Sequence, residues 1–380
     1  MKRSTHLIGW ILLSALAAYL LWAYTGRTAP AVSPQLQLDT TFVVNADSGK
    51  GNVIGINAWM EPADYTSGEH FFAKLDGYMN QCKQNNWLHP NTVVIFPEYI
   101  GTWLVLSEEK NEVYNAPTLE KAITKFVITN YFRYIASWFM SPDSATNKVT
   151  HSVFATKAKK MAGLYQDVFS RLAKKYRVTI IAGSILLQSP RIKNNRIIVK
   201  NGSLENVSAI FNPDGSLQPH FTRKAFPTAD EQPFTKRSLP GEQPVYDLPI
   251  GRTSVMICAD AWFPESYQAV QQRAPQFIAV PSFTPSENSM QRSWMGYSGF
   301  DAPADVQKED SGRISLREAW LKYTLPARIR PLNTPFGMTV SLRGRLWDLG
   351  TDGELIVYNR GQVICPRPMQ GASMVCLWLN

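Results

Sequence analysis

Residues 253–265 read TSVMICADAWFPE, and this stretch decides how the rest of the chain is interpreted. The first five residues, TSVMI, form an apolar run that is typical of a strand buried on both faces of a sheet. The strand is expected to end at Cys258, and a helix is expected over residues 265–273. Buried strands that alternate with helices indicate a layered α/β fold, whose sites form just beyond the strand ends.

Two further segments place polar residues after predicted strands. TVVIF at 92–96 is another buried strand and is followed by Pro97-Glu98. The turn signal NPDG at 212–215 belongs to a predicted hairpin that leads to Lys224. If the strand ends meet at one rim, Glu98, Lys224 and Cys258 meet there.

An acid, an ammonium group and a thiol together suit acyl transfer. The thiol attacks a carbonyl or nitrile carbon, the carboxylate moves the proton, and the ammonium group stabilises the developing oxyanion. Each residue alone also fits a structural role. Cys258 could be a small core residue, Glu98 a cap, and Lys224 a solvated loop lysine.

The order and local context of these residues resemble the carbon–nitrogen hydrolase (nitrilase) superfamily. Phe96-Pro97-Glu98 is similar to the first family motif, and NPDG followed by Arg223-Lys224 is similar to the second. CADAWFPE at 258–265 resembles the third, Cys-x-Asp-x-x-Phe-Pro-Glu, which is the most specific. The motifs span residues 96–265.

The resemblance implies a role for each matching residue. Cys258 would be the nucleophile, Glu98 the general base, and Lys224 the oxyanion stabiliser, helped by the backbone N–H of Ala259. Glu231, seven residues after Lys224, would orient that lysine and position the amine leaving group. Asp260 and Glu265 would be structural members of the third motif.

The resemblance also implies a four-layer αββα sandwich that commonly dimerises. No cofactor is expected. The pattern predicts long helices at 69–86 and 153–176, a strand at 178–187, and mixed rather than purely parallel sheets. Two stretches, 107–150 and 284–315, are longer than a compact member needs. ITNYFRYIASWFM at 128–140 is aromatic-rich, and it fits a buried helix, a lid or a membrane-contacting face.

The N-terminus carries one segment apolar enough to span a membrane. Residues 7–24 are 18 residues without a charge, and Lys2 and Arg3 precede them. The positive-inside rule then places the rest of the chain outside the cytoplasm. We expect a cytoplasmic tip and an uncleaved single-pass anchor at 1–26, a linker at 27–41, and one hydrolase domain at 42–380 on the periplasmic side. A cleaved signal peptide is the alternative.

Composition narrows the remaining function classes. Lys and Arg number 39 and Asp and Glu 30, but no basic block carries the interleaved aromatics of a nucleic-acid site. The four cysteines lack the spacing of a zinc site, so no metal is expected. Cys365 and Cys376 could pair in an oxidising compartment, and the sequence leaves that open.

The leading hypothesis is a membrane-anchored hydrolase of a non-peptide carbon–nitrogen bond in a small-molecule amide or nitrile. One alternative is N-acyl transfer to a lipid or lipoprotein amine, a reaction that a multi-spanning relative performs. A second is a non-catalytic binding module on the same fold. Neither the substrate nor the bond type follows from the sequence.

Overall fold

Two mixed sheets of six strands each form the centre of the molecule. The structure is a computed structural model that describes residues 2–27, 34–366 and 370–380. The first sheet has, in spatial order, β1 (Leu38–Val44), β20 (Ala372–Trp378), β2 (Asn52–Asn57), β4 (Thr92–Ile95), β5 (Thr179–Ile181) and β10 (Ile210–Phe211). The second has β12 (Val245–Leu248), β13 (Gly251–Val255), β14 (Phe277–Ser282), β15 (Phe336–Ser341), β18 (Ile356–Asn359) and β19 (Gln362–Ile364).

The two sheets pack face to face over a shared apolar core. Val53 and Val93 of the first sheet belong to the same buried cluster as Val255 and Met338 of the second. Gly55 lies at a close approach between the sheets, since a Cβ there would lie 2.4 Å from the Met338 sulfur and 3.0 Å from a Val340 methyl carbon. A side chain at this position would therefore require these neighbouring side chains to move.

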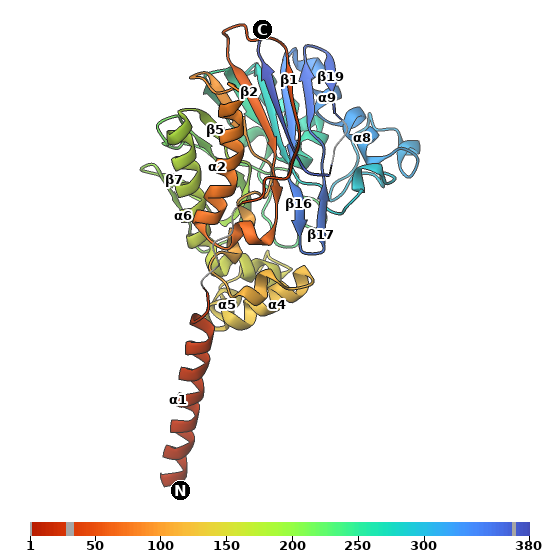
Figure 1. Ribbon diagram of the computed structural model, residues 1–380. Coiled ribbons are helices and arrows are strands. Elements are labelled where there is room, and N and C mark those ends of the chain that lie inside the picture. Colours follow the sequence, from red (N-terminus) through yellow and green to blue (C-terminus); the bar gives the residue numbers. More distant parts are fainter. Residues whose placement is uncertain (1, 28–33, 367–369) are drawn as a thin grey trace.

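Helices cover both outer faces, which completes the predicted four-layer sandwich (Figure 1). On the first sheet lie α2 (Gly68–Gln84) and α6 (Lys148–Tyr176). On the second lie α7 (Pro264–Gln271), α8 (Leu316–Tyr323) and α9 (Leu325–Arg328). On the first sheet, Phe169 of α6 packs edge-on against Phe96 just beyond β4.

Short elements extend the sandwich at its ends. They include β3 (Trp59–Met60), β6 (Ile185–Gln188), β9 (Leu204–Ser208), β11 (Thr222–Arg223), β16 (Arg343–Leu346), β17 (Leu349–Asp352), and the hairpin β7 (Arg191–Lys193) with β8 (Arg196–Ile198). The short 3-10 helices are η1 (Pro62–Tyr65), η2 (Thr102–Leu106), η3 (Pro240–Glu242), η4 (Cys258–Trp262), η5 (Ser289–Gln291), η6 (Lys308–Asp310) and η7 (Arg330–Leu332).

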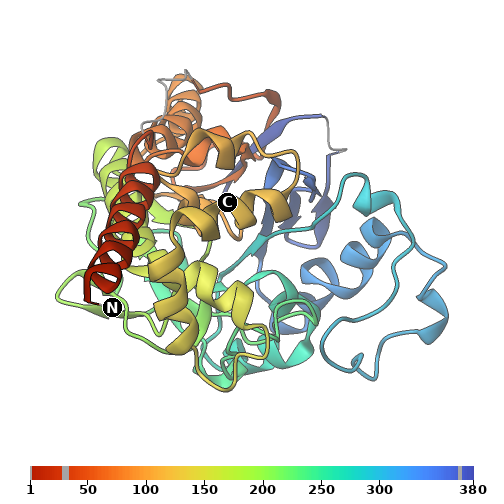
Figure 2. The same ribbon diagram turned by 90° about the horizontal axis from the view of Figure 1, so that it is seen from below.

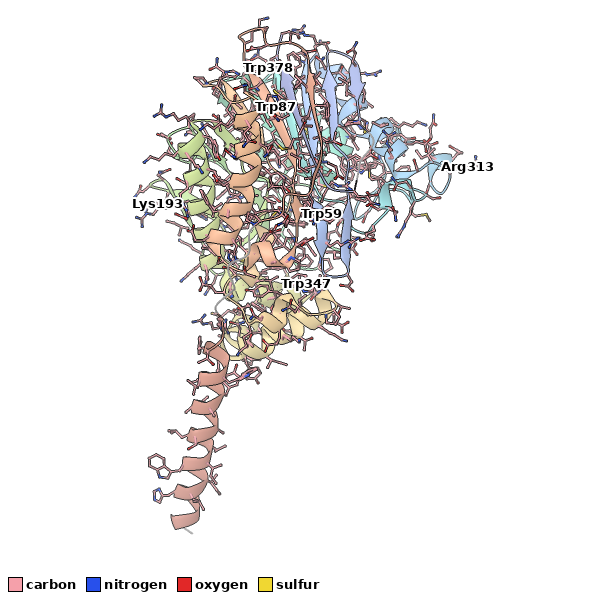
Figure 3. The ribbon with its side chains drawn as sticks, viewed as in Figure 1. Trp59, Trp87, Lys193, Arg313, Trp347 and Trp378 are labelled. Carbon is pink, nitrogen blue, oxygen red and sulfur yellow. The ribbon has the colours of Figure 1, made fainter. Side chains whose placement is uncertain are left out.

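The long stretch expected at 107–150 contains a helical insertion, which we define as α3 (Asn111–Tyr114), α4 (Leu119–Thr129) and α5 (Tyr131–Phe139). It lies against one end of the sandwich, where the β16–β17 hairpin also reaches (Figure 1). Trp347 at the tip of that hairpin donates its indole N–H to the Val113 carbonyl at 3.1 Å. Figure 3 shows Trp347 at this junction.

The N-terminal helix α1 (Lys2–Tyr24) projects from the molecule beside the insertion (Figures 1 and 2). Its segment His6–Tyr24 is long and apolar enough to cross a membrane and is almost wholly exposed; a signal sequence would share these properties. The Tyr19 hydroxyl donates to the Ile128 carbonyl at 2.8 Å, and its ring packs edge-on against Phe132. Helix α1 is therefore attached to the insertion rather than joined to the sandwich by chain alone.

A group of three charged side chains, which we call the Glu109 cluster, secures this junction. The buried Glu109 carboxylate pairs with Lys157 of α6 and, at 3.0 Å, with Arg27 just after α1. Arg27 also donates to the Thr129 carbonyl at 2.9 Å. The cluster thereby ties the end of α1 to α4 and α6.

Several element limits differ from those expected. Strand β1 starts at Leu38 and pairs with β20, so the sheet begins before the expected domain start at Phe42. Part of the expected linker, residues 28–33, lies outside the described residues. Helix α6 begins at Lys148 rather than at 153, because Asn147 caps it by accepting a hydrogen bond from the Thr150 N–H. The strand expected at 178–187 is divided into β5 and β6.

The hairpin expected around NPDG is much reduced. The turn forms, with the Gly215 N–H donating to the Asn212 carbonyl at 2.8 Å. Beyond it, only Phe211 and Leu217 form a bridge. Strand β11, which precedes Lys224, instead pairs with β9. Lys224 thus reaches the rim from a neighbouring short sheet.

Candidate active site

Cys258 follows strand β13 at a sharp turn. Its φ is 48°, in the left-handed region that residues with a side chain rarely adopt. Asp260 holds this turn, because its carboxylate accepts the N–H groups of Ile257 at 3.1 Å, Ala225 at 2.9 Å and Phe226 at 2.8 Å. The same carboxylate thereby links the turn after Cys258 to the chain just after Lys224.

Glu98 lies at the end of β4 with its carboxylate almost fully buried. One oxygen accepts from Lys224 Nζ at 2.9 Å and from Asn206 Nδ2 at 2.8 Å. Burial raises the pKa of Glu98 to about 7, and the nearby Lys224 charge opposes this shift only in part. A carboxyl group with this pKa can exchange a proton near neutral pH.

Lys224 bridges Glu98 and a second buried carboxylate, Glu231, and we call these three residues the Lys224 cluster. Lys224 Nζ lies 2.7 Å from Glu231 Oε2. Glu231 also accepts from the Tyr99 hydroxyl and, at 2.8 Å, from the Thr228 N–H. Three donors thus hold this carboxylate in place.

The charges of this cluster support one another. Burial alone would lower the pKa of Lys224, but the negative charges of Glu231 and Glu98 outweigh it and raise that pKa well above its usual value. Burial likewise opposes ionisation of Glu231, but Lys224 and the hydrogen bonds from Tyr99 and Thr228 lower its pKa. Lys224 therefore stays protonated, and Glu231 stays ionised.

Cys258 is a thiol in this arrangement rather than a standing thiolate. Burial and the nearby Glu98 charge raise its pKa well above the usual value, although Lys224 opposes the shift. Its sulfur lies 3.5 Å from the Phe283 carbonyl, just beyond strand β14. Interaction with the Cys258 side chain also contributes to the pKa of Glu98, so the thiol and the carboxylate are neighbours.

These residues belong to the wall of a cavity of about 510 Å³. Glu98, Lys224, Glu231 and Cys258 all line it. Most of the remaining wall is apolar and comes from η2, α4, the start of α6, and the loop after β14. The volume lies within the range of small-molecule sites, about 300–1,000 Å³.

The structure therefore brings the sequence-predicted residues Glu98, Lys224, Cys258 and Glu231 together. Ala259 lies buried in η4 directly after Cys258. Two contributors were not foreseen. Tyr99 directly follows Glu98, so its position was a usable signal, whereas Asn206 lies mid-strand in β9 and had none.

The other cysteines do not line the cavity and are unpaired. The described residues contain four free cysteines and no disulfide, so Cys365 and Cys376 are not paired in this structure. Cys365 donates to Glu354 at 2.8 Å, and Cys376 accepts from Asn52 at 3.0 Å. Within the described ranges, no group of three or more His, Cys, Asp or Glu side chains is placed to hold a metal ion.

Comparison with known proteins identifies the family. The carbon–nitrogen hydrolase family model matches residues 60–302, which is more than half of the chain. The chain therefore belongs to the carbon–nitrogen hydrolase family of the nitrilase superfamily. A curated relative, the probable hydrolase YhcX of Bacillus subtilis, is 27% identical over 120 residues. That alignment spans 32% of this chain but only 21% of the relative's length.

Solved structures share the fold at low sequence identity. The amidase of Nesterenkonia sp. has a TM-score of 0.53 at 13% identity, covering 88% of this chain and 92% of the amidase. A cysteine-to-alanine variant of that enzyme in complex with butyramide has a TM-score of 0.51 at 13% identity, covering 86% of this chain and 91% of the variant. At these identities, the likeness establishes the nitrilase-like fold.

Proposed function

We propose that the protein is a membrane-anchored amidase that works through an acyl-enzyme on Cys258. The observation that carries this proposal is the Lys224 cluster, which is buried and lines a cavity together with a thiol. A buried base with a pKa of about 7 next to a thiol that is not ionised suits proton transfer coupled to attack.

In this mechanism the Cys258 sulfur attacks the amide carbonyl carbon while the thiol proton moves to Glu98. Lys224 and the Ala259 N–H stabilise the oxyanion. The C–N bond then breaks, Glu98 returns the proton to the departing amine, and Glu231 positions that amine. Water attacks the thioester with Glu98 as base and releases the acid and the free thiol.

Mass spectrometry after exposure to a pool of small amides tests the reaction. We expect an acyl group on Cys258 and release of free acid in the absence of added amine. No adduct and no acid release would contradict the proposal. Acid release replaced by amide formation with an added amine would favour the N-acyltransferase alternative.

We also propose that α1 spans the membrane and holds the hydrolase domain outside the cytoplasm, as a homodimer. The apolar, exposed segment His6–Tyr24 supports the anchor. An enzymatic reporter fused after residue 41 should be active only outside the cytoplasm, and cytoplasmic activity would contradict this placement. Light scattering of the detergent-solubilised chain tests the dimer.

A further inference from the structure

The cavity is much larger and more apolar than the reacting groups need. Beyond the Lys224 cluster, its wall is formed by aliphatic and aromatic side chains. They include Trp103, Val105 and Leu106 of η2, Leu119, Ile123 and Phe126 of α4. This part of the wall offers a hydrocarbon surface that a small polar amide would leave unfilled.

Helix α4 supplies one side of this wall through regular spacing. Leu119, Ile123 and Phe126 recur every three to four residues, so they share one face of the helix. That face lines the cavity, whereas Ile128 near the end of the helix is half-exposed on the outside. The insertion therefore supplies the apolar end of the pocket.

The charged and the apolar lining residues come from different segments of the chain. Asp230 and Glu231 come from the segment after Lys224, and their negative charges suit an amine leaving group. The apolar stretch under α4 has no charged side chain to receive an amine. A substrate bound with its carbonyl at Cys258 therefore directs its amine toward Glu231 and its acyl chain toward α4.

The outer surface of the insertion is also apolar. Ile128, Tyr131, Phe132, Phe139 and Met140 are exposed on α4, α5 and the residue that follows α5. They lie at the end of the molecule from which α1 projects (Figures 1 and 2). If α1 spans a bilayer, this surface faces the lipid, and the pocket wall belongs to the same insertion.

From these observations we infer that the pocket binds the long hydrocarbon chain of an acyl amide, with the chain under α4 and the amine beside Glu231. This inference rests on the proposed function and names its substrate class. A long-chain amide could enter the pocket from a bilayer or from water.

Two isomeric amides test the inference. N-ethyldodecanamide carries its long chain on the acyl side, and N-dodecylacetamide carries it on the amine side. Each buried methylene is worth about fourfold. We expect kcat/KM for N-ethyldodecanamide to exceed that of both its isomer and N-ethylacetamide by at least about 100-fold. The adduct on Cys258 should be a dodecanoyl group.

A substitution in the wall localises the chain. Ile123→Trp should lower the ratio of kcat/KM for N-ethyldodecanamide over N-ethylacetamide by at least about tenfold, because the indole occupies chain space. Thr124→Trp, on the exposed face of the same helix, is the matched control and should leave both rates unchanged. An unchanged ratio in Ile123→Trp would overturn the inference, as would a preference for N-dodecylacetamide or for N-ethylacetamide.

Binding to Cys258→Ala separates failure of this inference from failure of the proposed function. Suppose that Cys258→Ala binds N-ethyldodecanamide saturably, that adding Ile123→Trp weakens this binding, and that the wild type does not turn the amide over. This result would support the chain site and contradict the proposed hydrolase activity. Turnover without a preference for the long acyl chain would support the hydrolase activity and contradict the chain site. Turnover of the same amide presented in phosphatidylcholine vesicles indicates that the substrate enters from a bilayer. Turnover only from a water-soluble cyclodextrin complex indicates that it enters from water.

Discussion

Two of the buried groups of charged side chains in the described part of the chain differ in their surroundings, and of these two only one fits a catalytic role. The Lys224 cluster places one ammonium group between two carboxylates, whereas the Glu109 cluster places one carboxylate between two cations. The first lines the cavity beside a thiol, and the second does not line that cavity. Burial of charge alone therefore does not identify an active site.

The two lysines show how the surroundings set the charge. Two carboxylates raise the pKa of Lys224 well above its usual value. For Lys157, burial outweighs the single carboxylate and lowers the pKa to about 8. A firmly charged Lys224 suits stabilisation of an oxyanion, whereas Lys157 with Glu109 and Arg27 serves attachment of α1.

The largest expected effect separates two buried cysteines. Cys258→Ala should reduce turnover by about 10⁴-fold or more, because it removes the proposed nucleophile. Cys82→Ala on α2 is the control and should leave kcat/KM unchanged, since Cys82 is buried and does not line the cavity. Steady-state kinetics measures the turnover of both variants, and circular dichroism checks that both are folded. Activity retained by Cys258→Ala would exclude the proposed mechanism.

Replacing each of the two lysines by methionine, one at a time, tests the comparison between the clusters directly. Lys224→Met should lower kcat by about 10²–10³-fold through loss of oxyanion stabilisation. Lys157→Met should retain kcat but destabilise the fold by about 3 kcal/mol, because Glu109 loses one buried partner. Kinetics and urea unfolding of both variants provide the measurement. Equal loss of kcat in the two variants would refute the distinction between the clusters.

The pH profile tests Glu98 as the base. With a pKa of about 7, Glu98 is protonated in acid and cannot accept the thiol proton. We expect kcat/KM to fall about tenfold per unit below pH 7 and to level off above it. A profile that stays flat between pH 5 and 8, measured with an amide that carries no ionisable group, would contradict this role.

The smallest effect concerns stability at alkaline pH. Because the folded pKa of Lys157 is about 8 against an ordinary value of 10.5, the unfolded chain binds more protons between these values. The free energy of unfolding should therefore gain a positive contribution as pH rises through this range. The difference in the free energy of unfolding between wild type and Lys157→Met, measured by urea unfolding, isolates this contribution. A difference that does not change with pH would disprove the prediction.

The sequence could predict the strand ends that carry Glu98 and Cys258, because continuous apolar runs stop abruptly there. It could not predict Asn206 beside Glu98, since that contact depends on how β9 and β11 pair. The position of the insertion also depends on tertiary contacts. Nothing in ITNYFRYIASWFM distinguishes an outward face from an inward one until Tyr19 of α1 packs on Phe132.

The left-handed backbone at Cys258 affects which substitutions evolution would tolerate at this position. Holding a residue with a side chain at this φ costs about 1–2 kcal/mol. Glycine would avoid that steric cost, but it would give up the burial of the Cys258 side chain in the core and lose more chain entropy on folding. In a descendant whose substrate disappeared, relief of the strain would offset part of that loss, so folding would oppose replacement by glycine less here than at an unstrained core position. The residue proposed to define the activity is then less protected by folding than its burial suggests.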